Sequence, residues 1–181
     1  MHVIHMHISR QGVINKMKKK LCVLSLVSLL LLPAGLVQAS NQATQTVTLA
    51  VSAINEISVS AATLSMTVSA ATPGSQPTAV TNTATTYALT TNCATDGKKI
   101  TAVLNTSVPT NTTLKITLAA PTGAISEGQK TLTTSAVNVV TGVDAVAESG
   151  IQISYEFSAA IAAGIVSATD VVVTLTIADT V

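Results

Sequence analysis

Apolar residues recur at every second position through most of this chain, and no segment shows the three-to-four-residue spacing of a helix. The clearest case is the stretch 45–60, QTVTLAVSAINEISVS. Successive side chains of a strand point to opposite faces, so this pattern predicts a long strand with one buried face. The apolar positions are Val47, Leu49, Val51, Ala53, Ile57 and Val59.

Later segments repeat the pattern between turns that contain Gly or Pro. They cover residues 64–68, 87–91, 100–104, 114–118, 151–157 and 171–177, with a poorly alternating strand at 137–143. The pair Asp96-Gly97 is a turn signal, and we expect the strands on either side of it to form a hairpin. Residues 159–167 are rich in Ala and Gly and are expected to be a loop. About eight short strands at this spacing predict an all-β sandwich.

Residues 17–39 have the three parts of a secretory signal peptide: lysines 18–20, an apolar run at 21–32, and small residues before a cut after Ala39. The run is about a dozen residues, short of the roughly 20 that span a bilayer, so a retained membrane anchor is the weaker alternative. Met17 is the expected initiator. We therefore assign residues 1–39 to upstream residues and signal peptide, and expect the product to be secreted.

Loss of this leader removes every histidine and the only arginine, because His2, His5, His7 and Arg10 all precede Met17. Four lysines then face eight acidic residues, a net charge of −4. An acidic chain without arginine has no footprint for nucleic acid. Catalysis by a Ser-His-Asp or Cys-His group would lack its base, so an enzyme is not expected and no catalytic residue is assigned.

No cofactor or metal site is expected either. Asp144 and Glu148 do not match the dense oxygen-ligand spacing of a calcium loop, and Asp96 belongs to a turn. Zinc has no adequate ligand set. The aromatic residues Tyr155 and Phe157 share the core face of one strand, so no exposed platform is left for sugar binding.

Cys93 is the single cysteine after the leader, so no internal disulfide is expected. Two interpretations of it stay open. It is either a small buried apolar residue or one half of an intermolecular disulfide.

The order of elements resembles a known family. A signal peptide is followed by VTLAV and INEISV, then by a Tyr-centred strand and turn that end in Lys-Lys-Ile (residues 87–100), and the chain closes on VVVTLTIAD. This layout resembles bacterial fimbrial subunits assembled by donor-strand exchange, particularly the alpha-type colonisation-factor pilins. It is less similar to spore-coat-U-like pilins, because it lacks their cysteine pair.

The resemblance implies an immunoglobulin-like sandwich of about seven to nine strands, at residues 54–181, with an N-terminal extension strand at 40–53. That strand would complete the sheet of the next subunit, with Val47, Leu49 and Val51 filling a groove left open in the neighbour. The implied product is a homopolymeric, adhesive surface fibre, or fimbrium. The implied assembly partners are a periplasmic chaperone and an outer-membrane usher, with membrane contact during export only.

The competing interpretation is a monomeric secreted or cell-surface β-sandwich with a matrix or binding role. In that case the opening strand would fold back into its own sheet. The sequence pattern is the same whether this strand pairs in cis or in trans, and it names neither the assembly machinery nor an adhesion target.

Overall fold

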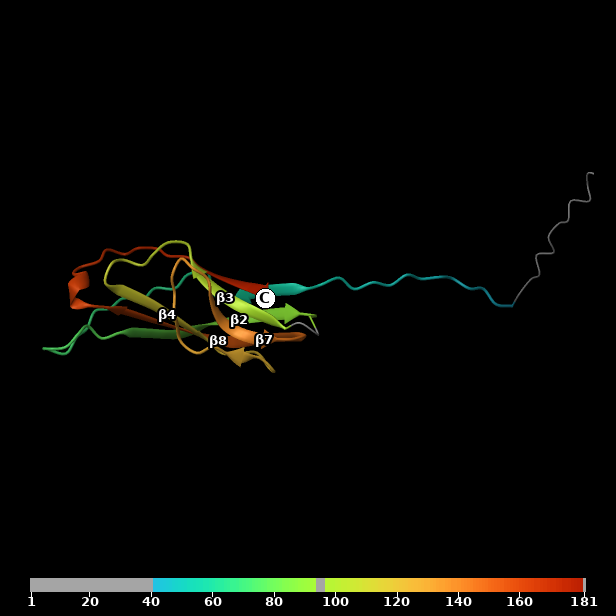
Figure 1. Ribbon diagram of the computed structural model, residues 1–181, viewed down its shortest axis with the longest axis horizontal. Helices are drawn as coiled ribbons and strands as arrows, with labels where there is room; N and C mark the ends of the chain where they lie inside the picture. The colour runs from blue at the N-terminus through green and yellow to red at the C-terminus, as the bar shows by residue number, and fades with distance from the viewer. Residues whose placement is uncertain (1–40, 94–96, 181) are drawn as a thin grey trace, which may run out of the picture. The chain divides into compact units, whose positions relative to one another are not determined.

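The computed structural model describes residues 41–93 and 97–180. The predicted leader, the initiator Met17 and the cut after Ala39 lie outside these residues. Regular structure among the described residues is nine strands and one short 3-10 turn, so the predicted all-β class is confirmed (Figure 1). The elements are β1 Asn55–Val59, β2 Val80–Thr91, β3 Lys98–Leu104, β4 Thr112–Leu118, β5 Ile125–Ser126, β6 Lys130–Thr131, β7 Val137–Val143, β8 Val146–Ala159, η1 Ile161–Ala163 and β9 Val173–Asp179.

The strands form two antiparallel sheets, with the orders β1-β2-β8-β4-β6 and β5-β7-β3-β9. Alternate residues of facing strands meet between the sheets, which gives the sandwich core. In β3 and β4 this alternation is regular, because every second residue is buried and the residues between them are half-exposed. The buried core is Tyr87, Leu89, Ile100, Ala102, Leu104, Leu114, Ile116, Leu118, Leu132, Val139, Val140, Val143, Ile151 and Ile153.

Tyr87 is the largest of the fully buried side chains and lies on the same face of β2 as the buried Leu89. Its hydroxyl donates a hydrogen bond to the carbonyl oxygen of Ala119 at 2.6 Å, which satisfies the one polar atom of the ring inside the core. Burial, and to a smaller extent the carboxylate of Glu148, raises the pKa of Tyr87 far above its usual value. The neutral phenol therefore connects β2 to the segment that follows β4.

The predicted hairpin around Asp96-Gly97 is wrong. β2 and β3 belong to different sheets, and β3 pairs with β7 and β9 instead. Both edges of β2 are already occupied, by β1 and by β8. A turn signal reverses the chain direction, but it does not decide which strands form hydrogen bonds with each other.

Two other segments that were predicted to be strands differ from that prediction. The strand predicted at 45–60 is present only as β1, and the alternating residues 64–68 form no strand, although Met66 packs against the core. A strand requires a neighbouring strand with which its main chain forms hydrogen bonds, and an alternating sequence alone does not supply that neighbour. Residues 159–167 contain the 3-10 turn η1 and otherwise form a loop, as expected.

The chain divides into two units, Met1–Leu49 and Ala50–Val181. In the first, residues 41–49 carry no helix or strand and are all exposed. The second contains both sheets and the core. Within the described part of the chain, no helix is long and apolar enough to cross a membrane.

Candidate functional site: the open edge of β9

The two sheets end in four edge strands, of which β9 is the longest. β5 and β6 have two residues each, and β6 carries Lys130, so these edges offer little for another strand to pair with. β9 has seven residues and pairs with β3 alone among the described residues of 50–180. A long unpaired edge presents a row of main-chain donors and acceptors, which is a template for a further strand.

The core-facing side chains of β9 are incompletely covered. Val173, Leu175 and Ile177 lie opposite Leu104, Ala102 and Ile100 of β3. These β3 residues are at most 2% exposed, whereas the three of β9 are only half-buried. The apolar face therefore continues from β3 onto β9, where the part of the chain that the structure describes covers it only in part.

The facing sheet is incomplete on the same side. β1 is its edge strand and lies close to β9 across the sandwich (Figure 1). Ile57 is half-buried although its partner Leu89 is fully buried, and Val59 is 46% exposed although its partner is the buried Tyr87. The core is thus thinly covered along one side, between β1 and β9, which we call the open edge.

Contacts at both ends hold β9 in place. Before it, the amide of Val172 donates to Asn105 Oδ1 at 2.8 Å, and the amide of Asn105 donates to the carbonyl of Val172 at 3.0 Å. At its end, Asp179 forms an ion pair with Lys98, whose hydrogen bond holds the pKa of the Asp179 carboxyl below its usual value. The edge is therefore a positioned strand, and an incoming strand would not have to order it first.

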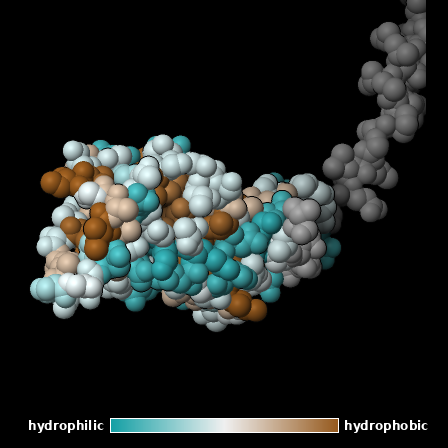
Figure 2. Space-filling model, turned by 60° about the vertical axis from the view of Figure 1, so that its left-hand side comes forward, coloured by the Kyte–Doolittle hydropathy of each residue, from teal (hydrophilic) through white to brown (hydrophobic). Residues whose placement is uncertain are grey.

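The predicted donor residues are strongly exposed. Val47, Leu49 and Val51 are 65%, 87% and 85% exposed, and no strand includes them. Exposed apolar side chains also occur elsewhere, and Figure 2 shows them as separate patches on one face. What distinguishes the donor residues is their spacing of two, which matches the spacing of Val173, Leu175 and Ile177.

The sequence analysis missed Asn92, which binds the base of this segment. Its Oδ1 accepts a hydrogen bond from the amide of Ile54 at 2.8 Å, and its Nδ2 donates to the carbonyl of Ser52 at 2.8 Å. Its amide also donates to the carbonyl of Ile54 at 3.3 Å. An Asn directly after a strand is an ordinary turn signal, so its role could not be recognised from the sequence.

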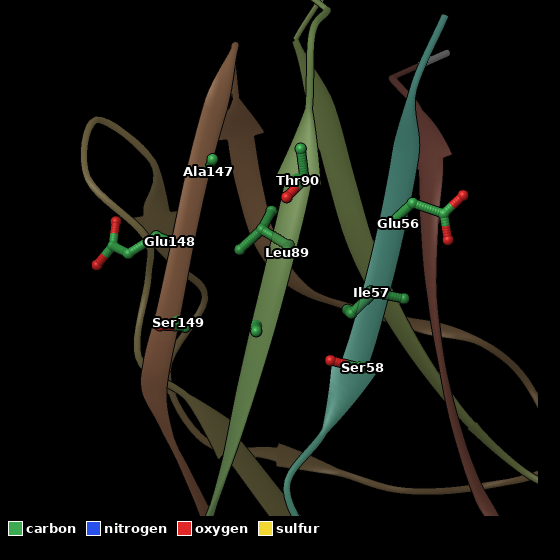
Figure 3. A pocket seen from close by; sticks show the side chains of 9 residues that line it. Glu56, Ile57, Ser58, Leu89, Thr90, Ala147, Glu148 and Ser149 are labelled. Atoms are coloured by element: carbon green, nitrogen blue, oxygen red, sulfur yellow. The ribbon is translucent and has the colours of Figure 1, made fainter.

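The structure also contains a hollow of about 400 Å³ that is open to solvent (Figure 3). In the close-up, the carboxylates of Glu56 and Glu148 point away from each other, and Glu148 accepts a hydrogen bond from the amide of Thr122. The hollow therefore offers no pair of groups for acid–base chemistry. Its lining is Glu56, Ile57, Ser58, Ala88, Leu89, Thr90, Ala147, Glu148 and Ser149.

The cysteine and the lysines that follow the predicted leader lie in the second unit of the chain. Cys93 is a free cysteine that is half-buried, so it is less enclosed than the buried interpretation requires. Lys98, Lys115 and Lys130 form ion pairs with Asp179, Glu156 and Glu127. Over the described ranges, no three His, Cys, Asp or Glu residues are grouped so that they could hold a metal ion.

Comparison of the chain with protein-family models, curated proteins and solved structures finds no match.

Proposed function

We propose that this chain is the structural subunit of an extracellular surface fibre, and that it polymerises by donating its N-terminal segment to a second copy. In this proposal residues 45–51 of one subunit form a strand along the open edge of the next. The observation that carries the proposal is β9, a seven-residue edge strand with a half-buried apolar row and one side that pairs with no strand of the described residues.

The donor and the edge match in pattern. A strand added beside β9 would place every second side chain on the core face, where Val173, Leu175 and Ile177 are incompletely covered. Val47, Leu49 and Val51 have the spacing to continue this row, and Thr48 and Ala50 between them would face water. The immunoglobulin-like topology implied by the resemblance belongs to the same proposal.

Burial of the donated side chains would favour this pairing. Full burial of a Val or Leu side chain contributes about 1.5–3 kcal/mol, so three such residues offset a substantial part of the cost of ordering the segment. Main-chain hydrogen bonds to the β9 edge add to this. While these three side chains are exposed to water, they contribute no free energy of burial. Transfer of the segment to a neighbour is therefore favoured.

Donation between copies explains why a fibre would form. The donated segment and the β9 edge are different surfaces, so the contact is heterologous and each added subunit leaves a new open edge. Export by the signal peptide, assembly with a periplasmic chaperone and an outer-membrane usher, and a role in adhesion complete the proposal. No enzymatic activity is part of it.

The test compares two chains, one beginning at Ser40 and one beginning at Ala53. We expect the longer chain to give heat-stable ladders on gels and filaments by electron microscopy, and the shorter chain to stay monomeric. A synthetic peptide of residues 45–53 should bind the shorter chain and raise its melting temperature, whereas a peptide with Val47, Leu49 and Val51 replaced by Asp should not. A well-folded monomer of the longer chain would overturn the proposal and favour the monomeric surface domain.

A further inference from the structure

We propose that Asn92 is a clamp that directs the N-terminal segment to a second copy of the chain, because it prevents the segment from turning back onto its own β9. This inference rests on the proposed function. It makes one residue responsible for whether the segment pairs with β9 of its own subunit (in cis) or with β9 of another copy (in trans).

The clamp is made of three hydrogen bonds around residues 52–54. Asn92 follows directly after β2, and it binds the amide and carbonyl of Ile54 and the carbonyl of Ser52. Next to it, the hydroxyl of Thr91 donates to Asn55 Oδ1 at 2.8 Å, at the first paired position of β1. The side chain of Asn92 thus extends the β1–β2 ladder beyond the end of β1 and keeps residues 52–54 in line with that strand.

Pairing in cis would require the chain to reverse at these same residues. β1 begins at Asn55, opposite the end of β2, and β9 ends at Asp179, opposite the start of β3. The start of β1 and the end of β9 therefore lie at the end of the sandwich where β2 is connected to β3. A segment 45–51 that covered its own β9 would have to turn sharply at 52–54, and the hydrogen bonds of Asn92 would have to break.

Two further features disfavour the cis arrangement. Sharp chain reversals favour Gly, Pro, Asn, Asp and Ser, whereas Ser52 is the only residue of these types among residues 52–54. The returning segment would also run in the same direction as β9, and parallel pairs are slightly less stable per residue than antiparallel pairs. A segment from another copy is bound by neither restriction, so the clamp and the local sequence both favour trans pairing.

The experiment uses the chain that begins at Ser40 and compares Asn92→Ala with Asn138→Ala. Asn138 is an exposed residue of β7, so its substitution controls for loss of a surface amide. For Asn92→Ala we expect the ratio of monomer to polymer in size-exclusion chromatography to rise at least about tenfold, the size expected from losing two hydrogen bonds of ordinary strength. Asn138→Ala should match the unchanged chain.

A second readout identifies the monomer. If it is closed in cis, its β9 amides will exchange slowly with deuterium, and it will melt at a higher temperature than the chain that begins at Ala53. A variant that failed to fold would show neither slower exchange of the β9 amides nor a higher melting temperature. A folded Asn92→Ala protein that polymerises as well as the unchanged chain would overturn the clamp.

A second variant covers the case in which Asn92→Ala does not fold. Asn92→Asp keeps the size of the side chain and the oxygen that accepts from the Ile54 amide, but it removes the donor to the Ser52 carbonyl. We expect it to raise the ratio of monomer to polymer in the same direction as Asn92→Ala, and unchanged polymerisation of the folded variant would overturn the inference. An unchanged chain that stays monomeric would instead refute the proposed function itself, so the two failures are distinguishable.

Discussion

Ile177 lies directly opposite Ile100 in the β3–β9 pair, yet Ile100 is fully buried and Ile177 is only half-buried. The two residues have the same chemistry and share one face of the sheet. Their different burial shows that the fully buried core ends at β3, although the apolar face of the sheet continues onto β9. A further strand beside β9 would bury Ile177 as well. The first two predictions concern the docking of such a strand, and the other two concern the stability of the fold.

The first prediction concerns the apolar row of β9. Leu175→Lys should abolish polymers of the chain that begins at Ser40, because a charged side chain in the centre of the row would be buried by an incoming strand. The variant should still fold, since Leu175 is half-buried and the long lysine side chain can reach water. Gel ladders and circular dichroism measure the two effects.

Thr174→Lys is the matched control for this prediction. Thr174 is the preceding residue of β9, is exposed, and faces away from the core. It should polymerise normally. If both lysine variants polymerise, the β9 row is not the docking surface.

The second prediction concerns the donated segment. Leu49→Asp should prevent a subunit from donating, while Thr48→Asp on the other face of the segment should have little effect. The Leu49→Asp subunit keeps its own open edge, so it should still accept a segment and end a growing fibre. Mixed with the unchanged chain, it should shorten filaments in proportion to its fraction, as measured by electron microscopy. Filaments of unchanged length would contradict donation through Leu49.

Much of the sandwich could be predicted from alternation alone. β4 illustrates this, because Leu114, Ile116 and Leu118 are buried and Lys115 between them reaches solvent and pairs with Glu156. The period of two is a property of each strand by itself, so it can be read locally. The class of fold and most strand positions follow from it.

The predictions that failed concern contacts between residues that are far apart in the sequence. Asp96-Gly97 predicted a hairpin, but the strands beside it join different sheets, since the edges of β2 are occupied by residues distant along the chain. Residues 45–51 have the strand pattern but form no strand. Asn92 was missed for the same reason, because the atoms that it binds lie 38 and 40 residues away.

The third prediction concerns acid stability. The hydrogen bond from Lys115 and, next, that from Gln129 lower the pKa of the Glu156 carboxyl below its usual value. A carboxyl whose folded pKa is lowered stabilises the fold above its unfolded pKa, and this contribution is lost as pH falls through the lower folded value. Lys115→Met should therefore reduce the melting temperature slightly at neutral pH, and the difference from the unchanged chain should disappear as pH falls through the lowered folded pKa of Glu156. A difference that persists in acid would contradict this origin.

The fourth prediction concerns alkaline stability and Tyr87. Burial raises the pKa of Tyr87 and of Tyr155 above the usual value of a tyrosine, about 10, so the stabilisation from each neutral phenol is fully present below that pH. The contribution is lost as pH rises from about 10 through the raised folded values. Urea unfolding of the unchanged chain should therefore require less denaturant above pH 10 than at neutral pH.

Two phenylalanine variants separate hydrogen bonding from ionisation in this loss. Tyr87→Phe should cost about 1 kcal/mol at neutral pH, because the carbonyl of Ala119 loses its donor, yet it should flatten the alkaline decline. Tyr155→Phe should flatten its share of the decline without that neutral cost, since the Tyr155 hydroxyl has no hydrogen-bond partner among the described residues. If Tyr87→Phe loses stability above pH 10 as steeply as the unchanged chain does, ionisation of this buried phenol is not what limits the fold in alkali.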